Sequence, residues 1–142
     1  MANHDRTYLV SCVSRKGVTE APVKDLYLSP WFKAARRYIE ATGDPWYVLS
    51  AKYGLVDPNQ VLIPYDETLN KMAIAARRAW ANQVIKQMDQ LLTPGKTVVV
   101  LAGSRYREFL MDYLNQRFTV AIPMRGLTIG RQLQWLNAEV DS

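Results

Sequence analysis

The chain has 142 residues, 49% of them hydrophobic, and its 18 Lys and Arg against 13 Asp and Glu give a formal charge of +5. This length suits one globular core, so we expect a single domain over residues 1–142. Cys12 and His4 are the only residues of their kinds. One cysteine and one histidine are too few for an internal disulfide or for a zinc site made of Cys and His ligands.

No apolar stretch approaches the roughly 20 residues needed to cross a bilayer, and the first residues lack the pattern of a signal peptide. We therefore expect a cytoplasmic, monomeric protein with no membrane partner, no metal and no cofactor. The positive charge favours a polyanionic partner, and DNA is the partner we expect.

Along the chain, four apolar runs predict strands at residues 7–13, 46–51, 97–102 and 118–122. A long loop follows the first strand up to Leu28. Ser29 is then a typical N-cap and Pro30 a typical first helical residue, and Gly43 is a typical end for the helix that they start. A second long loop connects the strand at 46–51 to Thr68.

The longest helix is expected at residues 69–92, ended by Thr93-Pro94-Gly95. Its predicted apolar stripe consists of Met72, Ala76, Trp80, Val84, Met88 and Leu91. Further helices are expected after Gly103-Ser104 and after the loop at 126–130. Three tryptophans lie on apolar helix faces and are interpreted as core residues: Trp31, Trp80 and Trp135.

Strands separated by helices of this length predict an α/β fold, a single three-layer α/β/α sandwich with a mainly parallel four-stranded sheet in the order 2-1-3-4. All four strands run into polar loops, which would gather at the edge where open α/β sheets bind ligands. The basic residues at or just after strand ends are Arg15, Lys16, Lys52, Arg105, Arg107, Arg125 and Arg131.

The loop at residues 50–55, SAKYGL, has the features of a binding loop. Ser50 and Ala51 are small enough for a ligand to approach the backbone, Lys52 supplies a charge, and Gly54 permits a positive φ. The alternative is that Gly54 only makes a turn and Lys52 is solvated. Asp66 is either the cap of the following helix or a catalytic carboxylate, and Thr68 could cap the helix instead.

Gly103-Ser104-Arg105 brings backbone amides, a hydroxyl and a cation to a helix start, an arrangement that suits an anion. Neither a Walker loop nor a GxGxxG motif is present. Arg131 and Gln132 could contact a phosphate or a base edge. Three tyrosines could stack on a base: Tyr53, Tyr65 and Tyr106. Alternatively, each of them is an ordinary core or rim residue.

These motifs resemble a family of small bacterial and phage domains of unknown function, over most of the chain. The matching segments are 11–16, 50–55, 64–69, 103–110 and 123–136. That family is similar to the YaaA and uracil-DNA glycosylase-like superfamily, whose members share a sandwich with the active site at the carboxyl ends of the strands. The resemblance implies excision of a base from nucleic acid. Unlike those glycosylases, this chain has no acid in its first loop before Glu20 and no His in the segment 123–130.

The leading hypothesis is a DNA glycosylase that cleaves the N-glycosidic bond of a modified or damaged base, in genome defence against phage DNA. Asp66 would stabilise the oxocarbenium-like sugar or orient water, and Tyr53 would stack on the flipped base. Lys52 would neutralise the departing base, as Arg131 could, or attack C1′ as an amine. The expected nucleic-acid contacts are Ser14, Lys16, Ser50, Gly103, Ser104, Tyr106, Arg107, Arg125, Arg131 and Gln132.

Two alternatives use the same residues. The first is an N-glycosyl hydrolase or transferase that acts on a small nucleoside or nucleotide, and its sign would be a closed cleft without a basic track around it. The second is a nucleic-acid-binding module without catalytic activity, in which Asp66→Ala would leave DNA binding intact.

Overall fold

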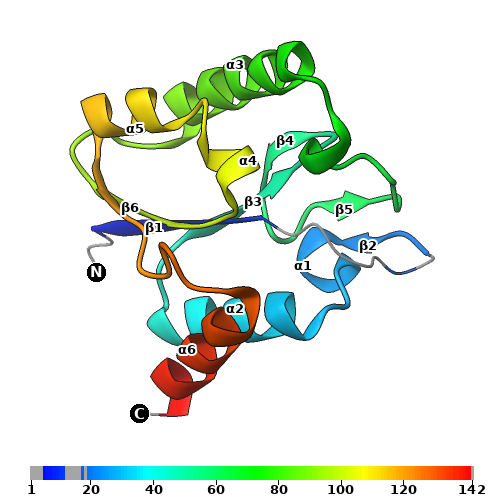
Figure 1. Ribbon diagram of the computed structural model, residues 1–142, viewed down its shortest axis with the longest axis vertical. Helices are drawn as coiled ribbons and strands as arrows, with labels where there is room; N and C mark the ends of the chain where they lie inside the picture. The colour runs from blue at the N-terminus through cyan, green and yellow to red at the C-terminus, as the bar shows by residue number, and fades with distance from the viewer. Residues whose placement is uncertain (1–4, 12–16, 18, 142) are drawn as a thin grey trace.

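The computed structural model describes residues 5–11, 17 and 19–141, and a five-stranded sheet lies at its centre (Figure 1). The strands are β1 (Arg6–Ser11), β3 (Trp46–Ser50), β4 (Gly54–Val56), β6 (Thr97–Leu101) and β7 (Thr119–Ala121). Their order is β4-β3-β1-β6-β7. The four predicted strands therefore have the predicted order 2-1-3-4, and they pair in parallel.

The prediction of a four-stranded sheet is wrong, because β4 adds a fifth strand that runs antiparallel to β3. The chain reverses directly after β3, and Gly54 takes a φ of 78° at the start of β4. Leu55 and Val56 then pair with Leu49 and Val48. The residues that sequence reasoning assigned to a binding loop are thus the turn of a hairpin and its second strand.

Helices cover both faces of the sheet, as the three-layer prediction requires (Figure 1). One face carries α2 (Pro30–Thr42) and α6 (Ile129–Asp141), and the other carries α3 (Ile74–Leu91), α4 (Ser104–Arg107) and α5 (Met111–Arg117). The predicted limits of α2 are confirmed. The Ser29 hydroxyl accepts a hydrogen bond from the Phe32 amide at 3.1 Å, and Gly43 ends the helix with a φ of 73°.

The two long predicted loops contain short elements that pair with each other. β2 (Ala21–Pro22) runs antiparallel to β5 (Val61–Leu62), and the short helix α1 (Val23–Leu26) follows β2. The amide of Val23 donates to the carbonyl of Gln60 at 2.8 Å. Two-residue strands are too short to leave a periodic pattern in the sequence, and their pairing depends on contacts between distant segments. Sequence reasoning therefore could not find them.

The predicted continuous helix over residues 69–92 is wrong. A 3-10 helix, η1 (Leu69–Lys71), comes first, and Met72 and Ala73 are extended before α3 begins at Ile74. Thr68 caps η1, since its hydroxyl accepts from the Asn70 amide at 3.4 Å. The buried stripe of α3 is correspondingly narrower than predicted and consists of Trp80, Ala81, Val84 and Met88, whereas Ala76 and Leu91 are exposed.

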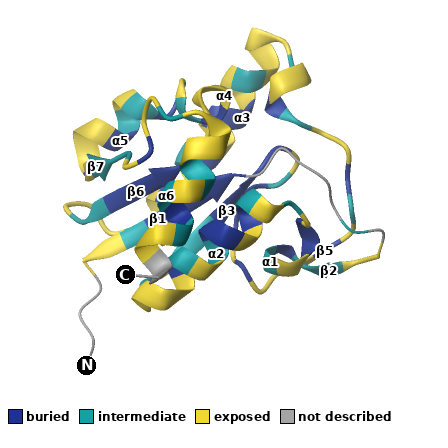
Figure 2. Ribbon diagram, turned by 60° about the horizontal axis from the view of Figure 1, so that its bottom comes forward, coloured by how far each residue is buried: buried dark blue, intermediate teal, exposed yellow. Residues whose placement is uncertain are grey.

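The core lies on both faces of the central strands, which Figure 2 shows as buried, with the exposed residues of the helices turned outward. Trp80 is buried, as predicted. Trp31 and Trp135 are only partly buried and pack against the core from its margin, so their assignment to the core is wrong in part. Among the described residues, no helix is long and apolar enough to cross a membrane, and no group of three or more His, Cys, Asp or Glu could hold a metal ion.

Candidate functional site

A pocket that combines polar and aromatic side chains opens at the carboxyl ends of the parallel strands. It has a volume of about 570 Å³ and lies beyond β1 and β6, among the N-terminal turns of α2, α4 and α6. We call it the aromatic pocket. Its lining residues are Ser11, Ser29, Pro30, Trp31, Asn70, Gly103, Ser104, Arg105, Tyr106, Ile129, Gln132 and Leu133.

One wall of the aromatic pocket is an indole ring held by a side-chain amide. Trp31 Nε1 donates to Gln132 Oε1 at 2.9 Å, and Gln132 Nε2 donates to the Leu127 carbonyl oxygen at 2.9 Å. Because the amide is bonded at both ends, it bridges α2 and the loop before α6 and fixes the indole. Trp31 is only partly buried, so the pocket gains a flat ring on which another ring could stack.

A second aromatic residue of the pocket, Tyr106, is connected to the end of a neighbouring strand. Tyr106 is buried, and its ring meets that of Trp80 edge to face, with centroids 5.6 Å apart. Trp80 Nε1 in turn donates to the carbonyl oxygen of Ser50 at 2.8 Å. The position of the Tyr106 ring therefore depends on packing against α3 and, through Trp80, on the last residue of β3.

A smaller cavity of about 160 Å³ adjoins the aromatic pocket and shares four of its residues, Trp31, Gly103, Ser104 and Gln132. We call it the arginine cavity, because Arg107 and Arg125 also line it. Arg107 Nε is buried and has no hydrogen-bond partner among the described residues. A buried guanidinium nitrogen without an acceptor is costly for the free protein.

Acidic side chains near these arginines are turned to other partners. Glu108 accepts from Arg77 Nε at 2.6 Å, and its second oxygen lies 4.0 Å from Arg105 Nη1. Arg77 also donates through Nη1 to the Met72 carbonyl at 2.7 Å, which ties the segment after η1 to α4. No carboxylate is found among the described residues that line the two cavities. Their charge is therefore positive.

Ser50, Tyr65 and Tyr27 form a buried chain of hydroxyl groups, which we call the hydroxyl cluster. Ser50 Oγ donates to Tyr65 Oη at 2.8 Å, and the hydroxyls of Tyr65 and Tyr27 are hydrogen-bonded to each other. Ser50 Oγ also accepts from the amides of Lys52 and Tyr53 at 3.3 and 3.1 Å. The cluster therefore joins the β3–β4 turn, the segment after β5 and the residue after α1.

The three predicted catalytic residues lie beside the hydroxyl cluster. Tyr53 meets Tyr65 edge to face at a centroid distance of 5.9 Å, and Lys52 Nζ lies 5.5 Å from the centroid of Tyr53. Asp66 directly follows Tyr65 and is exposed, as is Lys52. The structure thus brings these residues onto neighbouring segments, and all three of them, although described, are absent from the linings of the two cavities.

The predicted nucleic-acid contacts fall into distinct groups. Six of them line the aromatic pocket, the arginine cavity or both: Gly103, Ser104, Tyr106, Arg107, Arg125 and Gln132. Ser50 is fully buried in the hydroxyl cluster, and Arg131 is exposed in the first turn of α6. Ser14 and Lys16 lie outside the described residues.

Sequence reasoning missed Trp31 and Asn70 as lining residues. Trp31 recurs at helical spacing with Ala34, Ala35 and Tyr38, and the same spacing is typical of a core residue. Its place in the first turn of α2 is the signal that could have found it, because helices that follow parallel strands begin at the ligand-binding edge of the sheet.

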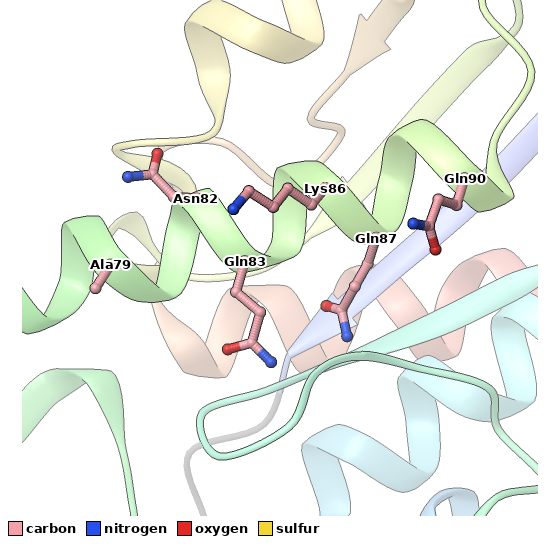
Figure 3. Close-up of a pocket in the computed structure, with 6 residues that line it drawn as sticks. All are labelled: Ala79, Asn82, Gln83, Lys86, Gln87 and Gln90. Atoms are coloured by element: carbon pink, nitrogen blue, oxygen red, sulfur yellow. The ribbon is translucent and has the colours of Figure 1, made fainter.

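Another hollow, of about 410 Å³, follows the exposed side of α3 (Figure 3). Its lining consists of Ala79, Asn82, Gln83, Lys86, Gln87 and Gln90, all from one helix. Gln87 has a structural role there, because its Oε1 accepts from the Leu55 amide at 2.8 Å and its Nε2 donates to the Tyr53 carbonyl at 3.2 Å. A surface built from one helix does not enclose a ligand, so we do not place the functional site on it.

Comparisons with known proteins identify relatives without an assigned activity. The model of a family of unknown function, DUF6884, matches residues 7–138. The chain is also similar to the uncharacterized protein YfjM of Bacillus subtilis (strain 168), with 29% identity over 126 residues that cover 83% of this chain and 79% of the relative. No solved structure matches.

Proposed function

We propose, from the premise that the chain belongs to the DUF6884 family of unknown function, that the protein is a DNA N-glycosylase with a uracil-DNA glycosylase-like fold. It would remove a modified or damaged base and leave an abasic site, in defence against phage DNA. The observation that supports this proposal most is the aromatic pocket, in which an indole and a phenol ring lie beside a cationic cavity at the ligand-binding edge of the sheet.

The pocket suits a base that has been taken out of a duplex. Glycosylases flip the target nucleotide and hold its base by stacking and by hydrogen bonds. Trp31 offers a partly exposed ring for stacking, the buried Tyr106 contributes to the pocket wall, and Ser104 and Asn70 offer polar groups. The volume of about 570 Å³ is within the range of small-molecule sites, so a base and its sugar fit.

The proposed chemistry breaks the bond between C1′ of the sugar and a ring nitrogen of the base. The electron pair leaves with the base, a water oxygen bonds to C1′, and the proton that this water loses passes to the Asp66 carboxylate and then to the departing base. Asp66 is the carboxylate proposed to orient that water and to stabilise the sugar cation. Lys52 lies on the neighbouring segment, joined through Ser50 and Tyr65, and is proposed to offset the negative charge on the departing base.

Cationic residues around the pocket favour a nucleic acid over a free nucleoside. Arg105 lines the aromatic pocket, Arg107 and Arg125 line the arginine cavity, and the exposed Arg131 lies in the first turn of α6. Several cations along one edge can follow successive phosphates, which makes affinity dependent on salt. A pocket for a free nucleoside would not need them.

One observation favours a second candidate, a nucleic-acid-binding module without catalytic activity. The described residues that line the two cavities include no carboxylate. Asp66 is exposed on the segment before η1 and would have to reach the sugar from outside the pocket. The binding module retains the aromatic and cationic contacts and needs no contribution from Asp66 or Lys52.

Base release separates the two candidates. The purified protein is incubated with DNA of normal bases, with uracil-containing DNA and with phage DNA that carries modified cytosines, and released bases and abasic sites are measured by mass spectrometry. We expect release from one of these DNAs, lowered by about 100-fold or more in Asp66→Asn, a magnitude typical of a lost acid or base catalyst. Asp57→Asn is the matched control, because Asp57 is an exposed turn carboxylate whose side chain accepts from the Asn59 amide.

Equal release by the wild-type protein and Asp66→Asn would contradict the assignment of Asp66. The absence of release from all three DNAs, together with salt-sensitive binding, would contradict the glycosylase and favour the binding module. Treatment with borohydride distinguishes the two proposed roles of Lys52. An amine nucleophile forms a covalent adduct with the sugar that borohydride traps, whereas a charge partner forms none. Lys52→Met is the control, because it should lose any such adduct.

A further inference from the structure

We propose that the arginine cavity binds the phosphate of the nucleotide whose base occupies the aromatic pocket, so that the site takes a phosphorylated nucleotide unit and discriminates against a free base or nucleoside. This inference rests on the proposed function, because it assigns the neighbouring pocket to a base. It adds a defined anion subsite to that pocket.

Contiguity of the two cavities is the first argument. They share Trp31, Gly103, Ser104 and Gln132, so the two cavities lie side by side at the same end of the sheet. Trp31 and Ser104, which each line both cavities, are the residues that a ligand occupying both would contact. The smaller cavity, at about 160 Å³, has the space of about five water molecules at roughly 30 Å³ each, which accommodates a phosphate group.

The state of Arg107 is the second argument. Its Nε is buried without a hydrogen-bond partner among the described residues, and no ion pair joins its guanidinium to a described carboxylate. Other arginines of the chain do have carboxylate partners, for example Arg77 with Glu108 at 2.6 Å. Because Nε itself is buried, an anion in the cavity would be bound by the remaining N–H groups of this guanidinium, whose charge no described carboxylate offsets.

The composition of the cavity identifies the anion. Two guanidinium groups, Arg107 and Arg125, line it together with the hydroxyl-bearing Ser104. Guanidinium forks match the oxygens of a phosphate in pairs, and the resulting charge-assisted hydrogen bonds are stronger than neutral ones. Since the cavity adjoins an aromatic wall, the anion expected there is a phosphate on the same molecule as a ring.

Calorimetric titration tests the subsite without any catalytic step. The four deoxynucleosides and their 5′- and 3′-monophosphates are titrated into the full chain, with inorganic phosphate alone as a further probe. We expect at least one monophosphate to bind about ten-fold or more tightly than its nucleoside, as a charged hydrogen bond in a partly buried site predicts. Arg107→Gln should remove most of that difference.

Two further variants keep the test independent of folding. Arg125→Gln changes an exposed residue of the same cavity and should lower the preference for the monophosphate without a change in the unfolding midpoint. Arg6→Gln removes the same charge from the exposed start of β1, at the opposite edge of the sheet, and should leave the preference unchanged.

The inference is overturned if monophosphates bind no better than nucleosides, or if Arg6→Gln lowers the preference as much as Arg107→Gln and Arg125→Gln do. Base release is measured separately. Release from DNA without a preference for phosphate would overturn the subsite alone, whereas a preference for phosphate without release from any DNA would overturn the glycosylase alone.

Discussion

The hydroxyl cluster and the arginine cavity lie at the same edge of the sheet, and they differ in how their polar groups are satisfied. In the cluster, Ser50 donates one hydrogen bond and accepts two, all within the chain. In the cavity, Arg107 keeps a buried donor without a partner among the described residues. Each region contains side chains that sequence reasoning assigned to nucleic-acid binding.

This difference distinguishes residues that stabilise the fold from residues that bind a ligand. A group whose hydrogen bonds are complete inside the protein has little capacity left for a ligand, and its loss lowers stability. A group that lacks an internal partner costs stability in the free protein and gains most from a ligand. We therefore expect substitutions in the cluster to act on folding and substitutions around the two cavities to act on binding.

The largest effect on stability is expected for Ser50→Val. It removes the hydroxyl that Tyr65 Oη and the amides of Lys52 and Tyr53 share, and the free energy of unfolding should fall by about 3 kcal/mol because three buried or partly buried groups lose a partner. Urea unfolding measures the change. Ser104→Ala, at an exposed lining position, is the matched control and should change stability by less than about 0.5 kcal/mol. Similar losses of unfolding free energy in both variants would contradict the distinction between the hydroxyl cluster and the lining of the two cavities.

Gly54→Ala, in the turn next to the cluster, should lower the free energy of unfolding by about 2 kcal/mol. Gly54 has a φ of 78°, and an added Cβ would lie 2.3 Å from Gln87 Oε1, the atom that accepts from the Leu55 amide. Gly43→Ala isolates the contribution of φ, because Gly43 has a φ of 73° and no atom within 4 Å of the added Cβ. Thermal or urea unfolding should therefore show a loss of only about 1 kcal/mol for Gly43→Ala. Equal losses would show that the contact with Gln87 is unimportant.

A smaller effect on stability, with a clear effect on binding, is expected for Gln132→Leu. The variant loses the hydrogen bonds to Trp31 Nε1 and the Leu127 carbonyl, at a cost of about 1 kcal/mol, and it frees the indole to rotate. Affinity for a nucleoside monophosphate should fall about five-fold, because an unfixed ring must be ordered again when the ligand binds. Gln134→Leu, at an exposed position of the same helix, should leave affinity unchanged. If both variants bind equally well, Trp31 does not form the stacking wall.

Local signals in the sequence predicted much of the fold. Ser29, Pro30 and Gly43 mark both ends of α2, and the apolar runs mark the four parallel strands. The division between η1 and α3 left no such signal, because Met72 and Ala73 are good helix formers that tertiary contacts hold in extended conformations. Arg77 links this segment to α4, because it donates to the Met72 carbonyl and to Glu108.

The candidate site was predictable in its location and less so in its members. Gly103 and Ser104 follow β6 after one intervening residue, and residues beyond the carboxyl ends of parallel strands are expected at the ligand-binding edge. Trp31 escaped detection, since a pocket wall and a core residue have the same helical spacing. Ser50 is the last residue of a strand, yet its hydrogen-bond partner Tyr65 comes from a distant segment that no local pattern connects to it.

The measurement that tests the central claim most directly is the map of amide chemical-shift changes when a single-stranded oligonucleotide is added to the ¹⁵N-labelled protein. The account predicts that the largest changes occur at residues 103–107 and 125–132, around the aromatic pocket and the arginine cavity, with small changes at the amino ends of β1 and β6. Changes centred on Asn82, Lys86 and Gln90, in the hollow along α3, or at Arg6 and Thr97, would contradict it.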